Sequence, residues 1–478
     1  MKMILRWTLW GLLLSIIFRP ASLVIAQEEF TIQEGETVKV GLDSTFAPYG
    51  FLEDGEYTGF DVELAELIFE EMGVDYEFQS IDWSMKEAEL NNGNIDLIWN
   101  GYSVSPEREK LVAFSDIYID GRTGVLVKKD SDINSFKDLA GKKVATQEGS
   151  SQLESLMSQP QLVETFDNGR VITFSSFNEV LQELATDRVD AIVVAELITR
   201  YYFSQNGQAD DFRMIDEDFG ITSTAVGFRK SDQAFVDEFN TALEKVKKTQ
   251  AYAKIENKWF AELGGNEQSA SRVMWTPLLN AAKTTLFVFF VVLIVSIPLG
   301  LIMALLEQGA PQWIKAIIQV YVYVFRGSPL LLQMMVVYFG LPFLGIKLDR
   351  MDAALGTMII NYAAYLLEIF RGGLNAIPSG QYESLKVLSL NKITGYIKVI
   401  LPQVWQVVMP SIGNEVISLV KDTSLIYILG LDELLKMGRT LSNQYASMLP
   451  YLYVGVIYLA LTGIVTIILN QIEKRLEY

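Results

Sequence analysis

The sequence has 478 residues, half of them hydrophobic, and a formal net charge of −19. The length exceeds that of one ordinary domain, and the acidic surface would repel nucleic acid, so we expect two or three domains and exclude nucleic acid as a partner. Because the chain contains no cysteine and no histidine, it can form no disulfide, thiolate nucleophile, histidine-based triad or histidine-bearing zinc site.

The N-terminus has the features of an export signal. A basic start precedes a short apolar stretch over residues 7–18, and Val24-Ile25-Ala26 resembles a cleavage site. An uncleaved anchor helix is the alternative, but Arg19-Pro20 interrupts the apolar run early and favours cleavage. We therefore predict a signal peptide over residues 1–26.

Residues 27–265 are charged and mixed in composition, and they alternate between strand and helix patterns. Predicted strands cover residues 38–42, 95–99, 124–127, 143–146 and 189–194, and predicted helices cover residues 61–72, 179–185 and 232–247. Alternation of this kind predicts an α/β domain with largely parallel sheets, and the segment is long enough for two lobes.

Long apolar runs begin after a linker and pre-transmembrane segment at residues 266–282. Residues 283–478 contain five runs that are candidates for crossing a bilayer, namely 284–306, 317–344, 351–370, 400–431 and 451–472. The sequence therefore predicts an all-α transmembrane domain of five helices in the cell membrane.

The basic residues predict how this domain is oriented. Lys386, Lys392 and Lys398 lie between the third and fourth predicted spans, and Lys474-Arg475 follows the fifth. Basic loops stay in the cytoplasm, so we expect a cytoplasmic C-terminus. Counting back through five spans places residues 27–265 outside, in agreement with the export signal.

Four motifs in the first half carry a family resemblance. They are Gly41-Leu42-Asp43-Ser44-Thr45-Phe46-Ala47-Pro48-Tyr49, Gly59-Phe60-Asp61-Val62-Glu63, Asp82-Trp83-Ser84-Met85, and the stretch from Asp96 to Arg108. In order and spacing they resemble the polar amino acid family (family 3) of solute-binding proteins. The resemblance implies a type II periplasmic-binding-protein-like fold, in which two lobes close on a ligand.

The same resemblance implies a set of ligand-binding residues. Arg108 would grip the ligand carboxylate through its planar fork, helped by Ser103 and the backbone of Gly101. The other implied contacts are the aromatic walls Phe46 and Trp83, Asp43 near the ligand's amino group or side chain, and the second-lobe loop Gly149, Ser150 and Ser151. For Arg108 the alternative is a surface residue, for the aromatic residues a place in the core, and for the loop a simple helix cap.

One position departs from the family pattern. The family places an aspartate after the 189–194 strand to bind the ligand's ammonium, whereas this chain has Ala195 followed by Glu196. Either Glu196 substitutes, or Asp43 bears more of the role, or the ligand class differs. A solvated surface role is the alternative for Glu196.

The second half resembles permease subunits of amino acid ABC importers, of the histidine-glutamine-arginine type. The resemblance rests on Phe325-Arg326-Gly327-Ser328-Pro329, Glu368-Ile369-Phe370-Arg371-Gly372-Gly373 and the stretch from Gly413 to Leu425. It implies a cytoplasmic coupling helix that docks on an ATPase. The coupling residues would be Glu383, Ser384, Leu385 and Ser389, where serine and leucine replace the family's two alanines and Ser389 replaces its glycine.

The fourth predicted span contains Glu415, Lys421 and Asp422. Charges within spans are costly and usually face protein or water. One interpretation places these three residues on the translocation path. The other is that Lys421 and Asp422 simply neutralise each other.

These resemblances predict a fused binding and permease subunit of an importer for polar amino acids, working by alternating access. The chain has no phosphate-binding G-x-x-x-x-G-K-[ST] motif, so we expect no cofactor on this chain, no enzymatic activity, and ATP-Mg on a separate ATPase dimer. A second permease copy, as in a homodimer, would complete the path. The alternatives are a glutamate-receptor-type ion channel, a binding-only sensor and an enzyme, but all predicted spans follow the binding domain and no filter motif is visible.

Overall fold

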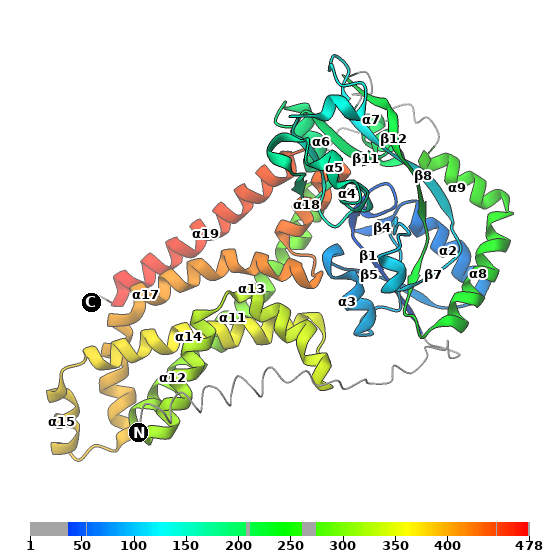
Figure 1. The fold of residues 1–478 in the computed structure, drawn as a ribbon. Coiled ribbons are helices and arrows are strands. Elements are labelled where there is room, and N and C mark those ends of the chain that lie inside the picture. Colours follow the sequence, from blue (N-terminus) through cyan, green and yellow to red (C-terminus); the bar gives the residue numbers. More distant parts are fainter. Residues whose placement is uncertain (1–36, 54, 207–210, 261–273, 446, 477–478) are drawn as a thin grey trace, which may run out of the picture.

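The computed structural model describes the chain except for residues 1–36, 54, 207–210, 261–273, 446 and 477–478. The predicted signal peptide and residues 266–273 of the predicted linker lie outside the described residues. Two α/β lobes form one end of the molecule, and a set of long helices extends away from them (Figure 1).

Lobe 1 is built on a five-stranded sheet. Its strands lie in the order β5 (Tyr76–Ser80), β1 (Val38–Leu42), β6 (Leu97–Ile98), β13 (Gly227–Phe228) and β7 (Ala113–Phe114). The first three pair in parallel, whereas β13 is antiparallel to both of its neighbours, β6 and β7. Helices α2 (Phe60–Met72), α3 (Lys86–Asn91), α8 (Gln233–Lys247) and α9 (Gln250–Phe260) complete the lobe, with a small sheet of β2 (Thr45–Phe46), β3 (Gly50–Glu53) and β4 (Glu56–Thr58).

Lobe 2 repeats this plan. Its sheet has the order β10 (Ile172–Phe174), β9 (Val144–Gln147), β11 (Ala191–Ala195), β8 (Ile119–Lys128) and β12 (Phe212–Thr224). Helices α4 (Ser151–Met157), α5 (Pro160–Val163), α6 (Phe177–Ala185) and α7 (Glu196–Asn206) belong to this lobe. The chain crosses between the lobes at the start of β8 and the end of β12, where Tyr118 N donates to Thr224 O.

Every strand and helix predicted for these lobes is present, and four of the five strands in each sheet run in the same direction. The fifth strand, β13 in lobe 1 and β8 in lobe 2, is antiparallel to both of its neighbours, so each sheet is mixed. Strands as short as β7 and β13 carry no periodicity of their own, because two residues cannot show an alternating pattern. Their pairing follows from the return of the chain through the hinge.

The membrane domain consists of α11 (Trp275–Gly309), α12 (Gln312–Gly327), α13 (Leu330–Met335), α14 (Arg350–Ala376), α15 (Ser379–Val387), α16 (Lys392–Gly395), α17 (Leu401–Asp422), α18 (Leu434–Gln444) and α19 (Leu449–Leu476). Among the described residues, three helices, α11, α14 and α19, are long and apolar enough to span a bilayer by themselves. Counting the bent pair 312–327 and 330–344 as one further span gives four, so the predicted helical membrane domain is present but the number of five is not confirmed exactly.

Two of the predicted spans differ from a straight apolar helix. The second is broken after Gly327, and its two halves meet at 108°. Pro329 begins the second half and cannot donate a backbone hydrogen bond, so the helix ends before it. The fourth, α17, contains two prolines and carries Glu415, Lys421 and Asp422, so its composition falls short of a spanning helix.

Lobe 1 lies directly on the membrane domain. Glu89 on α3 forms an ion pair with Arg350 on α14 at 3.1 Å, and it accepts a hydrogen bond from the Tyr338 hydroxyl at 3.0 Å. Lys436 on α18 also donates to Ser80 Oγ. Helix α15 lies at the opposite end of the membrane domain from the lobes (Figure 1).

Candidate ligand-binding site

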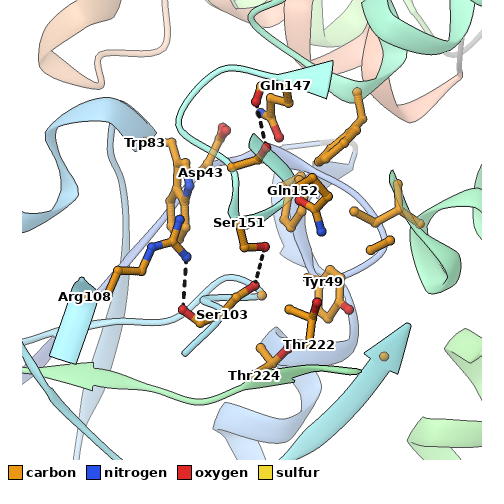
Figure 2. Close-up of a pocket in the computed structure, with 17 residues that line it drawn as sticks. Asp43, Tyr49, Trp83, Ser103, Arg108, Gln147, Ser151, Gln152, Thr222 and Thr224 are labelled. Atoms are coloured by element: carbon orange, nitrogen blue, oxygen red, sulfur yellow. Dashed lines mark hydrogen bonds between the residues drawn. The ribbon is translucent and has the colours of Figure 1, made fainter. Parts of the chain in front are cut away.

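A small cavity of about 40 Å³ lies between the two lobes, and residues of both lobes line it. Eight of the ten predicted ligand-binding residues are among them, namely Asp43, Phe46, Trp83, Gly101, Ser103, Arg108, Ser150 and Ser151. The lobes touch across the cavity, where Ser151 Oγ donates to Ser103 Oγ at 3.0 Å (Figure 2). The cleft is therefore closed.

Arg108 is buried in this cleft, with 5% of its surface exposed. Its Nη1 donates to Ser103 O in lobe 1 at 3.0 Å, whereas Nη2 donates to Gly149 O in lobe 2 at 3.1 Å. Nη2 also forms an ion pair with Glu154 at 3.0 Å. Among the described residues these contacts occupy at most three of the five N–H groups of the guanidinium, so at least two remain for a ligand carboxylate.

The alternative of a surface role for Arg108 does not fit this burial. The guanidinium also lies over the ring of Tyr102, 4.9 Å from its centroid. Glu154, on α4, was not predicted. Nothing in the sequence distinguishes Glu154 from other polar residues on a helix. It contacts Arg108 only because the two lobes are closed.

Asp43 lies just beyond the end of β1 and is held by the next turn. Its Oδ1 accepts hydrogen bonds from Thr45 N at 3.0 Å and Thr45 Oγ1 at 2.8 Å. Oδ2 makes no hydrogen bond to any described residue. Asp43 is also the one acidic side chain that lines the cavity within the described part of the chain. The cavity thus presents one cationic and one anionic group.

Phe46 and Trp83 both line the cavity and pack against other aromatic side chains. Phe46 stacks on Tyr49 with ring centroids 5.4 Å apart, and Trp83 meets Tyr102 edge-on at 5.7 Å. Both predicted residues line the cavity while resting on aromatic neighbours. An aromatic wall of this kind offers apolar contact to the stem of a ligand.

The predicted second-lobe loop combines capping and lining roles. Ser150 is the N-cap of α4, where its Oγ accepts from Leu153 N at 3.2 Å, and it also lines the cavity. Gly149 has a φ of 67° and does not line the cavity, but its carbonyl holds Arg108.

Glu196 does not line the cavity. It begins α7, and the lining residues nearby are Ala195 and Ile198. Among the described residues the cavity has no acidic group at the position where the family pattern has its aspartate. Asp43 is the remaining candidate of the two.

Several lining residues were missed in the sequence. They are Tyr49, Gly121, Gln147, Gln152, Phe177, Ile198, Thr222 and Thr224. Tyr49 lies within the first motif and could have been found there. The others come from lobe 2 and the hinge, where no quoted motif marks them.

Asp61 is buried behind the cleft and connects it to the hinge. Its Oδ2 accepts from Gly101 N at 2.6 Å and from the Tyr118 hydroxyl at 2.8 Å. Burial raises the pKa of this carboxyl to about 7, although the two hydrogen bonds oppose that shift. Asp61 thereby positions the backbone of a residue that lines the cavity.

The predicted residues of the membrane domain are spread over two regions. Asp422 accepts a hydrogen bond from the Tyr362 hydroxyl at 2.7 Å, and no ion pair joins it to Lys421 among the described residues. Glu415 is half-buried on the same helix. A further charged cluster, which the prediction did not include, joins Arg326 to Glu368 at 3.4 Å.

The predicted coupling residues lie on and just after α15. Glu383 and Ser384 are exposed, whereas Leu385 is buried. Ser389 has a φ of 50°, and the bonds from Ser389 N to Lys386 O and from Leu390 N to Leu385 O form a Schellman cap. Ser389 thus adopts the conformation for which glycine is usual at this position.

Comparison with known proteins assigns each half of the chain to a protein family. Residues 38–262 match the family of bacterial extracellular solute-binding proteins, family 3, and residues 296–478 match that of the binding-protein-dependent transport system inner membrane component. The chain belongs to both families. It therefore joins a solute-binding protein and a transport permease in one polypeptide, which leaves no support for an ion channel.

Two relatives from Bacillus subtilis illustrate the two halves. The arginine-binding extracellular protein ArtP is 33% identical over 46% of this chain and 85% of its own length. The arginine transport system permease protein ArtQ is 34% identical over 42% of this chain and 92% of its own. A histidine-bound substrate-binding protein from Streptococcus pneumoniae is 37% identical over 48% of this chain and 95% of its own, with a TM-score of 0.46.

We expect Arg108→Lys to weaken amino acid binding by roughly tenfold or more, because a lysine keeps the charge but loses the planar fork. The measurement is calorimetric titration of the purified chain. The exposed Lys110→Ala variant should bind normally. Unchanged affinity in Arg108→Lys would show that the ligand carboxylate lies elsewhere.

Asp61 should make stability depend on pH. Because its pKa is about 7 in the folded state, against an ordinary value of 3.8, the folded protein holds a proton that the unfolded chain loses between these values. Stability should therefore fall as pH rises through this window. Thermal unfolding across it should show a shallower fall in Asp61→Asn than in the wild type or in the exposed variant Asp75→Asn. Equal slopes in all three would contradict this assignment.

Proposed function

We propose that this chain captures a polar amino acid outside the cell and passes it inward as the receptor and permease subunit of an ABC importer. The carboxylate of the ligand binds Arg108, and its ammonium or a cationic side chain binds Asp43. Closure of the lobes covers the ligand with Phe46 and Trp83. The ligand is moved, not chemically altered.

The observation that carries this proposal is that two buried residues of opposite charge, Arg108 and Asp43, line the same cavity in the closed cleft. One fixed cation and one fixed anion complement a zwitterion, and a buried guanidinium has two N–H groups to spare. ArtP is an arginine-binding protein by name, and ArtQ is the permease protein of an arginine transport system. We therefore favour an amino acid with a polar or basic side chain.

The membrane domain would act in alternating access, with Glu415, Lys421 and Asp422 along the path. A second copy of the permease and a dimer of separate ATPase subunits, which bind the ATP-Mg, complete the proposed assembly. In this arrangement the lobes lie outside the cell membrane and the C-terminus inside.

The surface around α15 supports a docking role for the coupling segment. Val387, Leu388 and Ile393 are apolar and exposed, at 83%, 67% and 68%. Val387 lies on α15 together with Glu383 and Ser384, and α15 lies at the end of the membrane domain opposite the lobes (Figure 1). An apolar patch with a charged rim is a typical protein contact surface. We propose that it receives the ATPase.

A thermal-shift screen of the full chain against the twenty amino acids tests the proposal. A ligand present at 100 times its dissociation constant should stabilise the protein by roughly 2.7 kcal/mol. Uptake of that ligand by reconstituted vesicles would separate an importer from a binding-only sensor. If no amino acid stabilises the chain, the proposed function is wrong.

Glu383→Arg should spare ligand binding but reduce ligand-stimulated ATP hydrolysis, because it reverses a charge on the proposed docking surface. The measurement uses the chain reconstituted with the ATPase that co-purifies with it. The control is Glu164→Arg, an exposed substitution in lobe 2. Normal coupling in Glu383→Arg would place the ATPase contact elsewhere.

A further inference from the structure

The membrane domain reaches the edge of the ligand cleft through α18. Asn443 on this helix donates to Thr45 O in lobe 1 at 3.1 Å, and Ser442 O accepts from Asn178 of lobe 2 at 2.8 Å. Thr45 is also the residue that holds Asp43. One helix of the permease therefore contacts both lobes beside the cavity.

Arg439, on the same helix, lies directly behind the cavity wall. Its Nη2 donates to Ser175 O at 2.6 Å, and the same carbonyl accepts from Gln147 Nε2 at 3.3 Å. Gln147 lines the cavity. The Nε of Arg439 is buried and has no hydrogen-bond partner among the described residues. The guanidinium of Arg439 on the permease and the Gln147 side chain that lines the cavity thus donate to the same carbonyl.

The charge of Arg439 acts on the acidic side of the cleft. Burial lowers the pKa of this guanidinium, but the acidic groups around it, first Asp43 and then Tyr451, outweigh that effect and raise it. Asp43 is the acidic lining residue described above. Arg439 and a cationic group on the ligand would therefore both be attracted to the carboxylate of Asp43, and they would repel each other.

We propose that Arg439 is a specificity residue of the ligand cleft that the membrane domain supplies. Its positive charge disfavours a ligand with a cationic side chain relative to a neutral one of the same shape. The penalty applies while the lobes rest on the membrane domain, so it also favours release of a cationic ligand there. This inference rests on the proposed function, since it requires an amino acid in the cleft.

The test compares L-arginine with L-citrulline, which has nearly the same shape but no side-chain charge. Each is titrated into the purified full chain. In Arg439→Gln the affinity ratio should shift toward arginine by roughly tenfold, the effect of two unit charges about 10 Å apart at an effective dielectric constant of about 20. Arg439→Lys keeps the charge and should keep the wild-type ratio.

Arg350→Gln is the matched control. Arg350 is also an arginine of the membrane domain that contacts lobe 1, through Glu89 and Ser80 O, but neither of these residues lines the cavity. Its loss should leave the arginine-to-citrulline ratio unchanged. Retained citrulline binding in each variant shows that the protein is folded.

An unchanged ratio in Arg439→Gln, or an equal shift in Arg350→Gln, would overturn the inference and leave the proposed function standing. The proposed function fails in a different way. In that case citrulline and all twenty amino acids of the screen would fail to bind the wild type and Arg439→Gln alike, and the inference would fall with it.

Discussion

The buried guanidinium of Arg108 is the constraint on which the closed form of the two lobes depends. A full charge taken out of water is tolerated only where acceptors surround it. Here the acceptors come from both sides of the cleft, with Ser103 O in lobe 1 and Gly149 O and Glu154 in lobe 2. Separating the lobes would remove two of these partners, Gly149 O and Glu154. The closed position of the lobes therefore stabilises the buried charge of Arg108.

Glu154 has a particular place in that link. It offers Arg108 a carboxylate from the protein itself, and its second oxygen is buried without a hydrogen-bond partner among the described residues. A ligand carboxylate would approach the same guanidinium. Arg108 therefore already has one carboxylate partner in the closed cleft, which limits how much a ligand gains by adding a second anion.

The contacts between lobes and membrane domain combine polar pairs with apolar packing, in which Leu52 of lobe 1 packs in one cluster with Met437 and Leu441 of α18. Glu89 meets Arg350 and Tyr338 on one side, and α18 meets Thr45 and Asn178 on the other. Interfaces of this type within a chain resemble transient contacts between proteins. A receptor fused to its permease also gains a high local concentration there.

The sequence by itself determined the division into an α/β part and a membrane part, because alternating patterns and long apolar runs are local properties of the chain. It also indicated Arg108, Ser103 and Trp83, since these residues lie in motifs whose spacing is read along the chain.

Only the tertiary structure decided which residues of lobe 2 face the ligand cleft and which residues of the membrane domain stand behind it. Gln152, Thr222 and Glu154 lie far from Arg108 in sequence and come to the cleft only when the lobes close. Sequence position also could not decide the role of Glu196. It follows the expected strand, but in the folded structure it does not line the cavity. Arg439 is the extreme case, because its place beside the cleft depends on how the lobes and the membrane domain pack together.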